Sequence, residues 1–349
     1  MPGKISIAGT VAVEYLTRYP KSSTLGLAKL LFRDEPAVFR SVKHALDTVR
    51  WHRGERSNGR VKACPRPVAA RTIESRTAAR SSSRIRLPAS ECEPYEPVHI
   101  TRDDCRRLLD LSDIHLPYHC PRSISAALRW GERWGSDGVV FNGDTLDCYQ
   151  LSNFEKDPRK RNVAGELKLW RQLVAAVIER VRPKRIWFKL GNHEERYERY
   201  LINHAPALLG LDEIDFTRLI SHDERGQPLF GPGIEVIDGK RVIWAGDHLA
   251  LIHGHEYVKA VLAPVNVARG YFLKAKTCLV VAHHHISHEH SERNLKGKLV
   301  RAWSQGCLCG LNPSYMPQNR WNNGFAGIEL SADGGFEMHN KVIDSGTVL

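Results

Sequence analysis

Apolar side chains recur at helical spacing three times within the first 54 residues. Residues 11–18, 25–32 and 36–54 each show such a run, and the third begins at a proline, which suits the first turn of a helix. Three short helices joined by polar turns predict a helix-turn-helix, and residues 55–60, which contain Asn58-Gly59, could add a wing. A small helical bundle used for protein contacts remains open as an alternative.

The pattern breaks down after this segment. Residues 61–97 consist mainly of Arg, Ser, Ala, Pro and Glu, without a sustained apolar period, which is typical of a flexible linker. We therefore divide the chain into a helix-turn-helix-like domain at 1–60, a basic linker at 61–97 and a larger domain at 98–349.

Short apolar runs alternate with longer helical stretches in this larger domain. Strands are expected at 108–111, 139–141, 185–190, 234–237, 241–244, 249–252, 279–281, 299–303 and 327–330, and helices at 123–134, 166–181 and 258–274. The alternation predicts an α/β fold, and the simplest assembly is a two-layer β-sandwich flanked by helices.

Composition narrows the class of protein. Of the 349 residues, 42% are hydrophobic and 26% are charged, which is ordinary for a globular protein and excludes collagen-like, heptad-repeat and wholly disordered chains. No window approaches the ~18 apolar residues of a membrane helix, so we expect no membrane span, no signal peptide and no membrane partner. The 8 cysteines form no Cys-x-x-Cys pair, which favours a reducing compartment and a cytoplasmic location.

The formal charge is concentrated at one end of the chain. Residues 1–90 contain 18 basic residues (Lys and Arg) and 6 acidic residues (Asp and Glu), whereas residues 91–349 contain 33 basic and 33 acidic residues. A basic segment attached to a neutral body predicts a polyanionic partner, with DNA as the first candidate and a merely solvated tail as the alternative. The expected contacts on the third helix are Arg40, Lys43, Arg50 and Arg53.

Polar residues follow five of the predicted strands. Asp113-Ile114-His115, Asn142-Gly143-Asp144, Gly191-Asn192-His193-Glu194, His253-Gly254-His255 and His283-His284-His285 all stand at strand ends. Side chains that leave a sheet at its strand ends can converge on one crevice. Mixed carboxylate, amide and imidazole groups suit hard-to-borderline divalent ions, so the pattern predicts a metal centre.

This ordered set resembles the calcineurin-like metallophosphoesterase superfamily over about residues 107–290. The family motifs read Asp-x-His, Gly-Asp, Gly-Asn-His-Asp/Glu, His and Gly-His-x-His, and the last appears here with Ala282 in place of its glycine. The whole chain is also similar, more loosely, to phage or prophage members that carry an N-terminal winged-helix-like segment. The resemblance implies the metallophosphoesterase fold and a metal-dependent hydrolase of phosphoester bonds.

The resemblance also implies roles for individual residues. One ion would be held by Asp113, His115, Asp144 and His285, and a second by Asp144, Asn192, His253 and His283, with Asp144 bridging the two. The resemblance implies two divalent metal ions, with Mn²⁺ as the expected metal and Fe, Zn²⁺ and Mg²⁺ as alternatives. Two ions ~4 Å apart can lower the pKa of a shared water and stabilise the attacking and leaving oxygens. The catalytic residues would be Asp144 and His193, the latter facing the phosphate without binding metal.

Several assignments stay open at this level. His248 and His255 compete with His253 as the fourth motif. Asp147, Arg196 and Tyr197 lie close in sequence to the motifs and could touch substrate, although Arg196 could equally pair with a neighbouring glutamate. The aromatic-rich stretch 303–325 could line a substrate groove and stack bases, or close the core.

The function expected from these features is phosphodiester cleavage in nucleic acid, with the basic arm localising the enzyme on DNA. A hydrolase of a small phosphoester, such as a cyclic nucleotide, a nucleotide or a phosphoprotein, is the second hypothesis. A DNA-binding protein with a structural or degenerate metal site is the third.

Overall fold

A computed structural model describes residues 6–54, 89–92, 94–153, 155–160, 162–257 and 265–349. The chain divides into two compact units, Met1–Cys92 and Glu93–Leu349. The predicted wing at 55–60 and residues 61–88 of the predicted linker lie outside the described residues, so both stay predictions. Within the described part of the chain, no helix combines the length and the apolar character needed to cross a bilayer.

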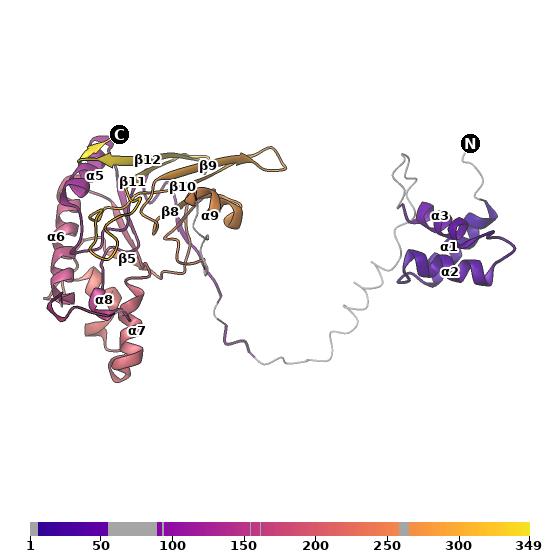
Figure 1. Ribbon diagram of the computed structural model, residues 1–349, viewed down its shortest axis with the longest axis horizontal. Coiled ribbons are helices and arrows are strands. Elements are labelled where there is room, and N and C mark those ends of the chain that lie inside the picture. Colours follow the sequence, from indigo (N-terminus) through magenta and orange to yellow (C-terminus); the bar gives the residue numbers. More distant parts are fainter. Residues whose placement is uncertain (1–5, 55–88, 93, 154, 161, 258–264) are drawn as a thin grey trace. The chain divides into compact units, whose positions relative to one another are not determined.

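The N-terminal unit contains three helices, α1 (Ile7–Arg18), α2 (Thr24–Asp34) and α3 (Val42–Arg53), as Figure 1 shows. Each begins at a serine whose side chain accepts a hydrogen bond from a backbone amide of the first turn. Their apolar faces bury one small core that comprises Ala12, Tyr15, Leu27, Ala28, Leu31, Phe39, Ala45 and Val49. The three predicted helices are therefore present.

The third helix begins later than predicted. The sequence indicated a start near Pro36, but α3 starts at Val42, after Ser41 caps it by accepting from the His44 amide at 3.1 Å. Residues before the cap form a turn instead, because Phe39 leaves the helical path and is completely buried in the core. Tertiary burial of one aromatic ring thus overrides the local proline signal.

Arg53 does not extend away from the helices. Its guanidinium donates to Thr24 Oγ1 at 2.9 Å and to the Ser22 carbonyl at 2.6 Å, which joins the end of α3 to the start of α2. These bonds give Arg53 a structural role within the N-terminal unit, and its contact with nucleic acid stays a prediction. The other three predicted contacts, Arg40, Lys43 and Arg50, have exposed side chains.

The larger unit contains two β-sheets. A seven-stranded sheet has the order β13-β12-β11-β2-β3-β4-β5, and a six-stranded sheet has the order β1-β6-β7-β8-β10-β9. The strands are β1 (Val98–Ile100), β2 (Arg107–Leu111), β3 (Gly138–Asn142), β4 (Arg185–Lys189), β5 (Ile234–Ile237), β6 (Ile243–Ala245), β7 (Leu249–Ile252), β8 (Cys278–Val281), β9 (His288–Arg293), β10 (Leu299–Ser304), β11 (Asn323–Leu330), β12 (Phe336–Asp344) and β13 (Thr347–Val348). All nine predicted strands are present within a few residues of their expected bounds, whereas β1, β9, β12 and β13 were not predicted.

Helices cover the outer faces of both sheets. Their bounds are α5 (Pro121–Trp134), α6 (Val163–Val181), α7 (Glu195–His204), α8 (Phe216–Ser221) and α9 (Val267–Ala275). The helix α9 covers the second half of the helix predicted at 258–274 and is capped by Asn266. Residues 258–264 of that prediction lie outside the described part. The helices α7 and α8 were not predicted.

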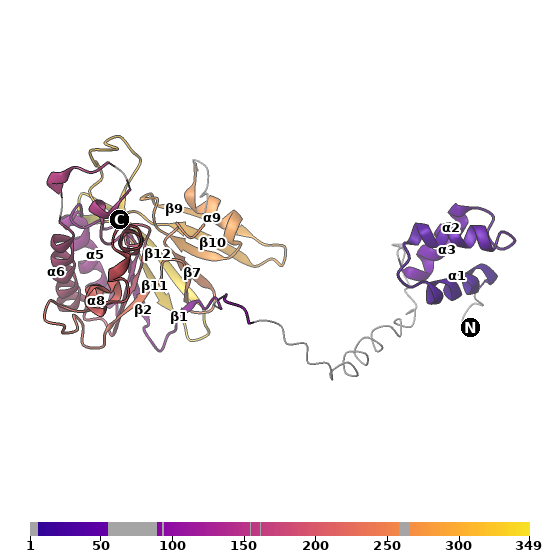
Figure 2. The ribbon, with the colours of Figure 1, turned by 90° about the horizontal axis from the view of Figure 1, so that it is seen from below.

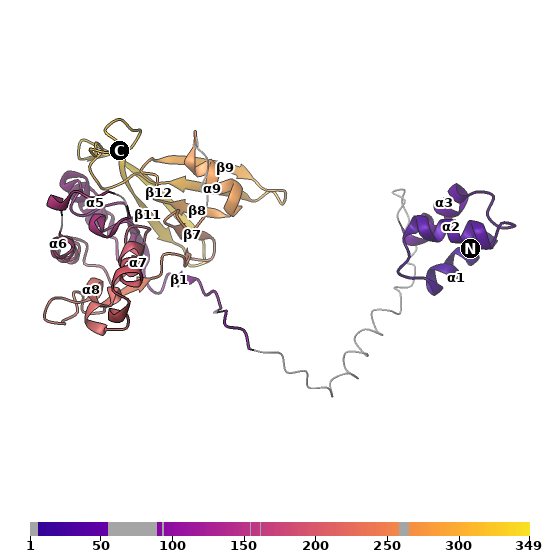
Figure 3. The same cartoon turned by 60° about the horizontal axis from the view of Figure 1, so that its bottom comes forward.

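The core is arranged in layers. One apolar cluster lies between the two sheets and includes Leu108, Val140 and Trp187 of the seven-stranded sheet with Leu251 and Val280 of the other. A second cluster fills the space between the seven-stranded sheet and the helices α5, α6 and α8, and a third lies under α9 on the far side of the six-stranded sheet. Figures 2 and 3 show α9 on the opposite side of the sandwich from α5 and α6. The predicted α/β sandwich flanked by helices agrees with this arrangement.

Strand direction places the polar motifs together. The strands β2, β3 and β4 run parallel to one another, and β7 runs parallel to β8. The carboxyl ends of these strands lie close together at one edge of the two sheets. Asn142 at the end of β3 donates to the carbonyl of Ile252 at the end of β7 over 3.3 Å. All five motifs therefore open onto one edge of the sandwich.

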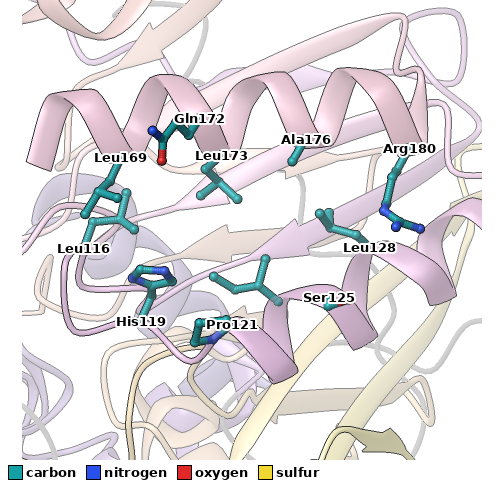
Figure 4. A pocket seen from close by; sticks show the side chains of 11 residues that line it. Leu116, His119, Pro121, Ser125, Leu128, Leu169, Gln172, Leu173, Ala176 and Arg180 are labelled. Atoms are coloured by element: carbon teal, nitrogen blue, oxygen red, sulfur yellow. The ribbon is translucent and has the colours of Figure 1, made fainter.

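An apolar cavity of about 260 Å³ lies elsewhere, between α5 and α6 (Figure 4). Leucines from both helices line it, with Gln172, Arg180 and His119 at its margins, and none of the predicted metal ligands takes part. This cavity is thus separate from the edge where the motifs gather.

The internal contacts of Arg53 lead to a prediction about stability. Replacing Arg53 with Ala removes two hydrogen bonds from a charged donor, and we expect the N-terminal unit to lose about 1–3 kcal/mol of stability. Hydrogen exchange of the α2 and α3 amides in the full chain would measure the loss. Arg50→Ala is the matched control, because Arg50 is exposed on the same helix, and equal protection in both variants would contradict the assignment.

Candidate metal centre

Seven side chains gather at the edge of the sandwich where the five parallel strands end. They are the residues that the family resemblance implies as ligands of two metal ions, Asp113, His115, Asp144, Asn192, His253, His283 and His285. In the structure they form two groups that meet at Asp144.

The first group contains two imidazoles that face each other. The Nε2 atoms of His115 and His285 are 3.3 Å apart, and His285 Nε2 is 3.1 Å from Asp113 Oδ1. Asp144 Oδ2 lies 3.9 Å from His115 Nε2. Two nitrogen atoms and two carboxylates that converge at such distances can hold a divalent cation between them.

The second group is formed by Asp144, His253 and His283, whose ligand atoms lie within 4.8 Å of one another. Asn192 comes from the loop that leads into α7. Two buried polar atoms of the predicted second set, Asn192 Oδ1 and His283 Nδ1, have no hydrogen-bond partner among the described residues. A buried polar atom without a partner is costly, so two such atoms in one predicted ligand set indicate a place for a cation.

Asp144 connects the two groups. Its Oδ2 atom lies 3.2 Å from His253 Nε2 and 3.9 Å from His115 Nε2, so the same oxygen serves both. Burial alone would favour the neutral acid, but His193 and His253 lower the pKa of Asp144 well below its ordinary value. The pKa of His253 is raised to about 10, against the effect of its burial, by Asp144 and Asp113. The site therefore draws positive charge to itself.

Supporting side chains orient the histidines. Asp147 Oδ1 lies 3.0 Å from His115 Nδ1, and the Asn142 carbonyl lies 2.9 Å from His253 Nδ1. Because a carboxylate and a carbonyl only accept, each ring carries its proton on Nδ1 and turns Nε2 toward the site. This is the usual outer arrangement of metal-binding histidines.

Glu194 connects the loops that follow β3 and β4. Its completely buried carboxylate accepts from the backbone amides of Asp144 at 3.0 Å, Leu146 at 2.8 Å and Gly191 at 2.8 Å. Burial, together with the charge of Asp144, raises the pKa of Glu194 to about 7 despite these donors. The fourth residue of the Gly-Asn-His-Glu motif is thus a structural tie between the β3 and β4 loops.

His193 lies beside the ligands and is held by two other groups. Its Nδ1 is 2.8 Å from the carbonyl of Asp147, and its Nε2 is 3.0 Å from the Arg196 guanidinium, which also donates to that carbonyl at 2.9 Å. The His193 Nε2 atom is 3.7 Å from Asp144 Oδ2. Arg196 therefore does not pair with a neighbouring glutamate, which was one of its two expected roles.

The backbone of the ligands is strained. Asp113, His115, Asp144, His283 and His285 all have φ between 50° and 67°, and they make up five of the nine non-glycine residues with positive φ in the described chain. Such a conformation costs of order 1–3 kcal/mol per residue and is concentrated at functional sites in proteins. Ala282 is not among these residues, so the alanine fits where the family motif has glycine.

Two glycines allow the loops to approach the ligands. A Cβ on Gly143 would lie 2.4 Å from His253 Nδ1, and one on Gly191 would lie 2.2 Å from Asp144 Oδ1. Neither position has room for a side chain. The Gly-Asp and Gly-Asn spacing therefore follows from the closeness of the loops.

The competing histidines have other surroundings. His255 Nε2 pairs with Glu195 at 3.0 Å, and His284 Nε2 is 2.9 Å from the Tyr271 hydroxyl. His248 stands between β6 and β7, before the strand whose far end carries His253. The choice of His253 over the other two agrees with the geometry.

The segment after β10 adds aromatic groups from the stretch 303–325 to the site, together with Cys309, which the sequence analysis did not single out. Cys309 Sγ lies 3.9 Å from His285 Nδ1, and the ring of Trp321 packs edge-on against His285 with centroids 4.2 Å apart. Tyr315 packs against Trp321 and keeps 75% of its surface exposed. The aromatic stretch is therefore divided, since Trp303 is buried in the core while Trp321 and Tyr315 border the metal centre.

Comparisons with known proteins give distant likenesses. No protein-family model and no curated protein matches the chain. Vacuolar Protein Sorting 29 from Cryptosporidium parvum is 13% identical over 70% of this chain and 94% of its own, with a TM-score of 0.36. Yfce, a phosphoesterase from E. coli, is 13% identical over 67% of this chain and 98% of its own, with a TM-score of 0.31. The nuclease MPE of Pseudomonas putida is 14% identical over 70% of this chain and 86% of its own, with a TM-score of 0.29.

The contact between Asp147 and His115 leads to a prediction about metal affinity. We expect Asp147→Ala to weaken Mn²⁺ binding about 10- to 100-fold, because the His115 ring loses the partner that orients it. Asp147→Asn keeps an acceptor and should lose less. Isothermal titration with Mn²⁺ measures both variants, and unchanged affinity in Asp147→Ala would contradict the role of Asp147 in orienting His115.

Proposed function

We propose that this chain is a two-metal phosphoesterase that cleaves phosphodiester bonds in nucleic acid. The observation that carries the proposal is the convergence of histidines from both sheets on Asp144. Asn192 Oδ1 and His283 Nδ1 of the predicted second set are in addition buried without a hydrogen-bond partner among the described residues. The motif resemblance to the calcineurin-like metallophosphoesterases supports the same conclusion independently of the geometry.

The residues fit two divalent ions. Asp113, His115, Asp144 and His285 would hold one, and Asp144, Asn192, His253 and His283 the other. When bound, two such ions supply Lewis acidity that activates water and neutralises charge on a phosphoryl group. Oxygen and imidazole donors suit Mn²⁺, Fe, Zn²⁺ or Mg²⁺, with Mn²⁺ the favoured candidate.

The chain's own contribution beyond the ligands is positioning. His193 and Arg196 lie next to Asp144 without belonging to either group, and Arg196 donates to His193 Nε2. An anionic phosphoryl group that enters between them can accept from the Arg196 guanidinium. His193 Nε2, once released from Arg196 and protonated, can then donate to a phosphoryl or leaving oxygen. Donors placed in this way stabilise the negative charge that develops during displacement at phosphorus.

Three surfaces support a polynucleotide substrate. Lys43, Arg50 and Trp51 are exposed along α3 of the N-terminal unit, next to Arg40. In the larger unit, Tyr315 and Trp321 offer aromatic faces beside the metal centre, on which bases can stack.

The third surface is the turn between β9 and β10, which projects from the sheet in Figure 1. It carries Arg293, Lys296 and Lys298 with exposed side chains around a fully exposed Leu295. Clustered cations of this kind favour contacts to phosphates.

Hydrolysis assays test the proposal directly. We expect wild-type protein with Mn²⁺ to cleave bis-p-nitrophenyl phosphate and labelled single- or double-stranded DNA, and both activities to disappear after chelation and in Asp144→Ala. Turnover of p-nitrophenyl phosphate alone would favour the small-phosphoester hypothesis. Absence of turnover with any divalent ion would leave a DNA-binding protein with a degenerate metal site.

The basic arm adds a second readout to the same assay. The triple variant Arg40→Ala, Lys43→Ala, Arg50→Ala should lower DNA cleavage about 10-fold or more near physiological salt, because phosphate contacts dominate non-specific affinity. Cleavage of bis-p-nitrophenyl phosphate should not change, since these exposed residues belong to the other unit. Equal DNA cleavage by the triple variant and wild type would assign the arm a role other than substrate binding.

A further inference from the structure

A second cavity adjoins the metal centre on the side of α7. It has a volume of about 240 Å³ and is lined by Leu151, Asn153, Asn192, Arg196 and Arg199. Two of the five lining residues are arginines one turn apart on α7, and none is acidic. Asn192 is the predicted ligand of the second ion, so the cavity opens directly beside that group.

The two guanidiniums differ in their attachment to the site. Arg196 is fixed to His193 and to the Asp147 carbonyl and so spans the metal centre and the cavity. Arg199 is more loosely held, since its recorded ion pair is with Glu195 at 3.5 Å and half of its side chain is exposed. Glu195 is itself engaged by His255 at 3.0 Å. Arg199 can therefore turn toward an incoming anion without breaking a buried contact.

We propose that this cavity is a subsite for a second phosphate, the non-reacting phosphate that neighbours the scissile one along a polynucleotide, with Arg199 as its principal contact. The inference rests on the proposed function and narrows it. Guanidinium groups bind phosphate with two parallel hydrogen bonds, and Asn153 offers a further donor at the cavity. Such a subsite would select nucleic acid over diesters that carry only one phosphate.

Binding of small nucleotides tests the subsite without turnover. Full-length protein loaded with Mn²⁺ should bind thymidine 3′,5′-bisphosphate about 10- to 100-fold more tightly than thymidine 5′-monophosphate, as expected for one added charge-assisted contact. Arg199→Ala should abolish this preference and leave affinity for the monophosphate unchanged, while Arg199→Lys should restore part of it. Isothermal titration measures each pair.

Two control variants test whether the preference for the bisphosphate depends on the overall positive charge of the protein or on the ion pair between Arg199 and Glu195. Arg225→Ala removes an exposed arginine outside the cavity and should keep the preference for the bisphosphate. Glu195→Gln removes the partner of Arg199 and should keep or increase it. Equal affinity of the wild type for the two nucleotides, or the same loss in Arg225→Ala as in Arg199→Ala, would overturn the proposal.

Hydrolysis distinguishes failure of the subsite from failure of the proposed function. Arg199→Ala should cleave bis-p-nitrophenyl phosphate and the dinucleotide TpT as the wild type does, but should lose the higher kcat/KM that we expect for pTpT or TpTp. Cleavage of bis-p-nitrophenyl phosphate with no gain from an added phosphate rejects the subsite alone. A retained bisphosphate preference without hydrolysis of any ester supports the subsite and rejects the enzyme.

Discussion

The buried carboxylate of Asp144 is the constraint on which the rest of the site depends. It stands at the end of β3, where two groups of imidazoles approach it from both sheets, and one oxygen lies within 4 Å of His115, His193 and His253. A negative charge so enclosed is stable only when cations surround it. The nearest of these side chains is His253, whose Nε2 atom lies 3.2 Å from Asp144 Oδ2 and whose pKa Asp144 and Asp113 raise to about 10 against the effect of burial. Bound divalent ions would supply the positive charge that this carboxylate requires.

The architecture around Asp144 serves to hold this arrangement. Glu194 ties three backbone amides of the two adjoining loops, and Glu166 accepts from the amide of Cys148 at 2.8 Å further along the same segment. Glycine at positions 143 and 191 lets the loops approach to distances that no side chain would permit. The layered core on both sides of each sheet supplies the rigidity that keeps the strained ligand backbone in place.

Sequence alone was sufficient for the elements and residues whose signals are local. Carboxylates and histidines stood at strand ends where apolar residues would be expected, so a metal centre at one edge of the sheets could be predicted. The assignment of seven ligands to two ions came from the family resemblance. The start of α3 could not, because the burial of Phe39 depends on α1 and α2. The structural role of Arg53 could not be predicted for the same reason, since Thr24 and Ser22 meet it only in the folded unit. The partners of Arg196, and the approach of Cys309 and Trp321 to His285, arise from loops far apart in sequence that carry no periodic pattern.

The central claim is that Asp144 joins two metal sites built from separate residues, and metal content tests it most directly. After loading with Mn²⁺ and removal of excess ion, we expect elemental analysis to find about two ions per wild-type chain, as a two-metal centre requires. His283→Ala should retain about one, because its side chain belongs to only one group, and Asp144→Ala should retain less than one. Equal metal content in wild type and Asp144→Ala would contradict the account.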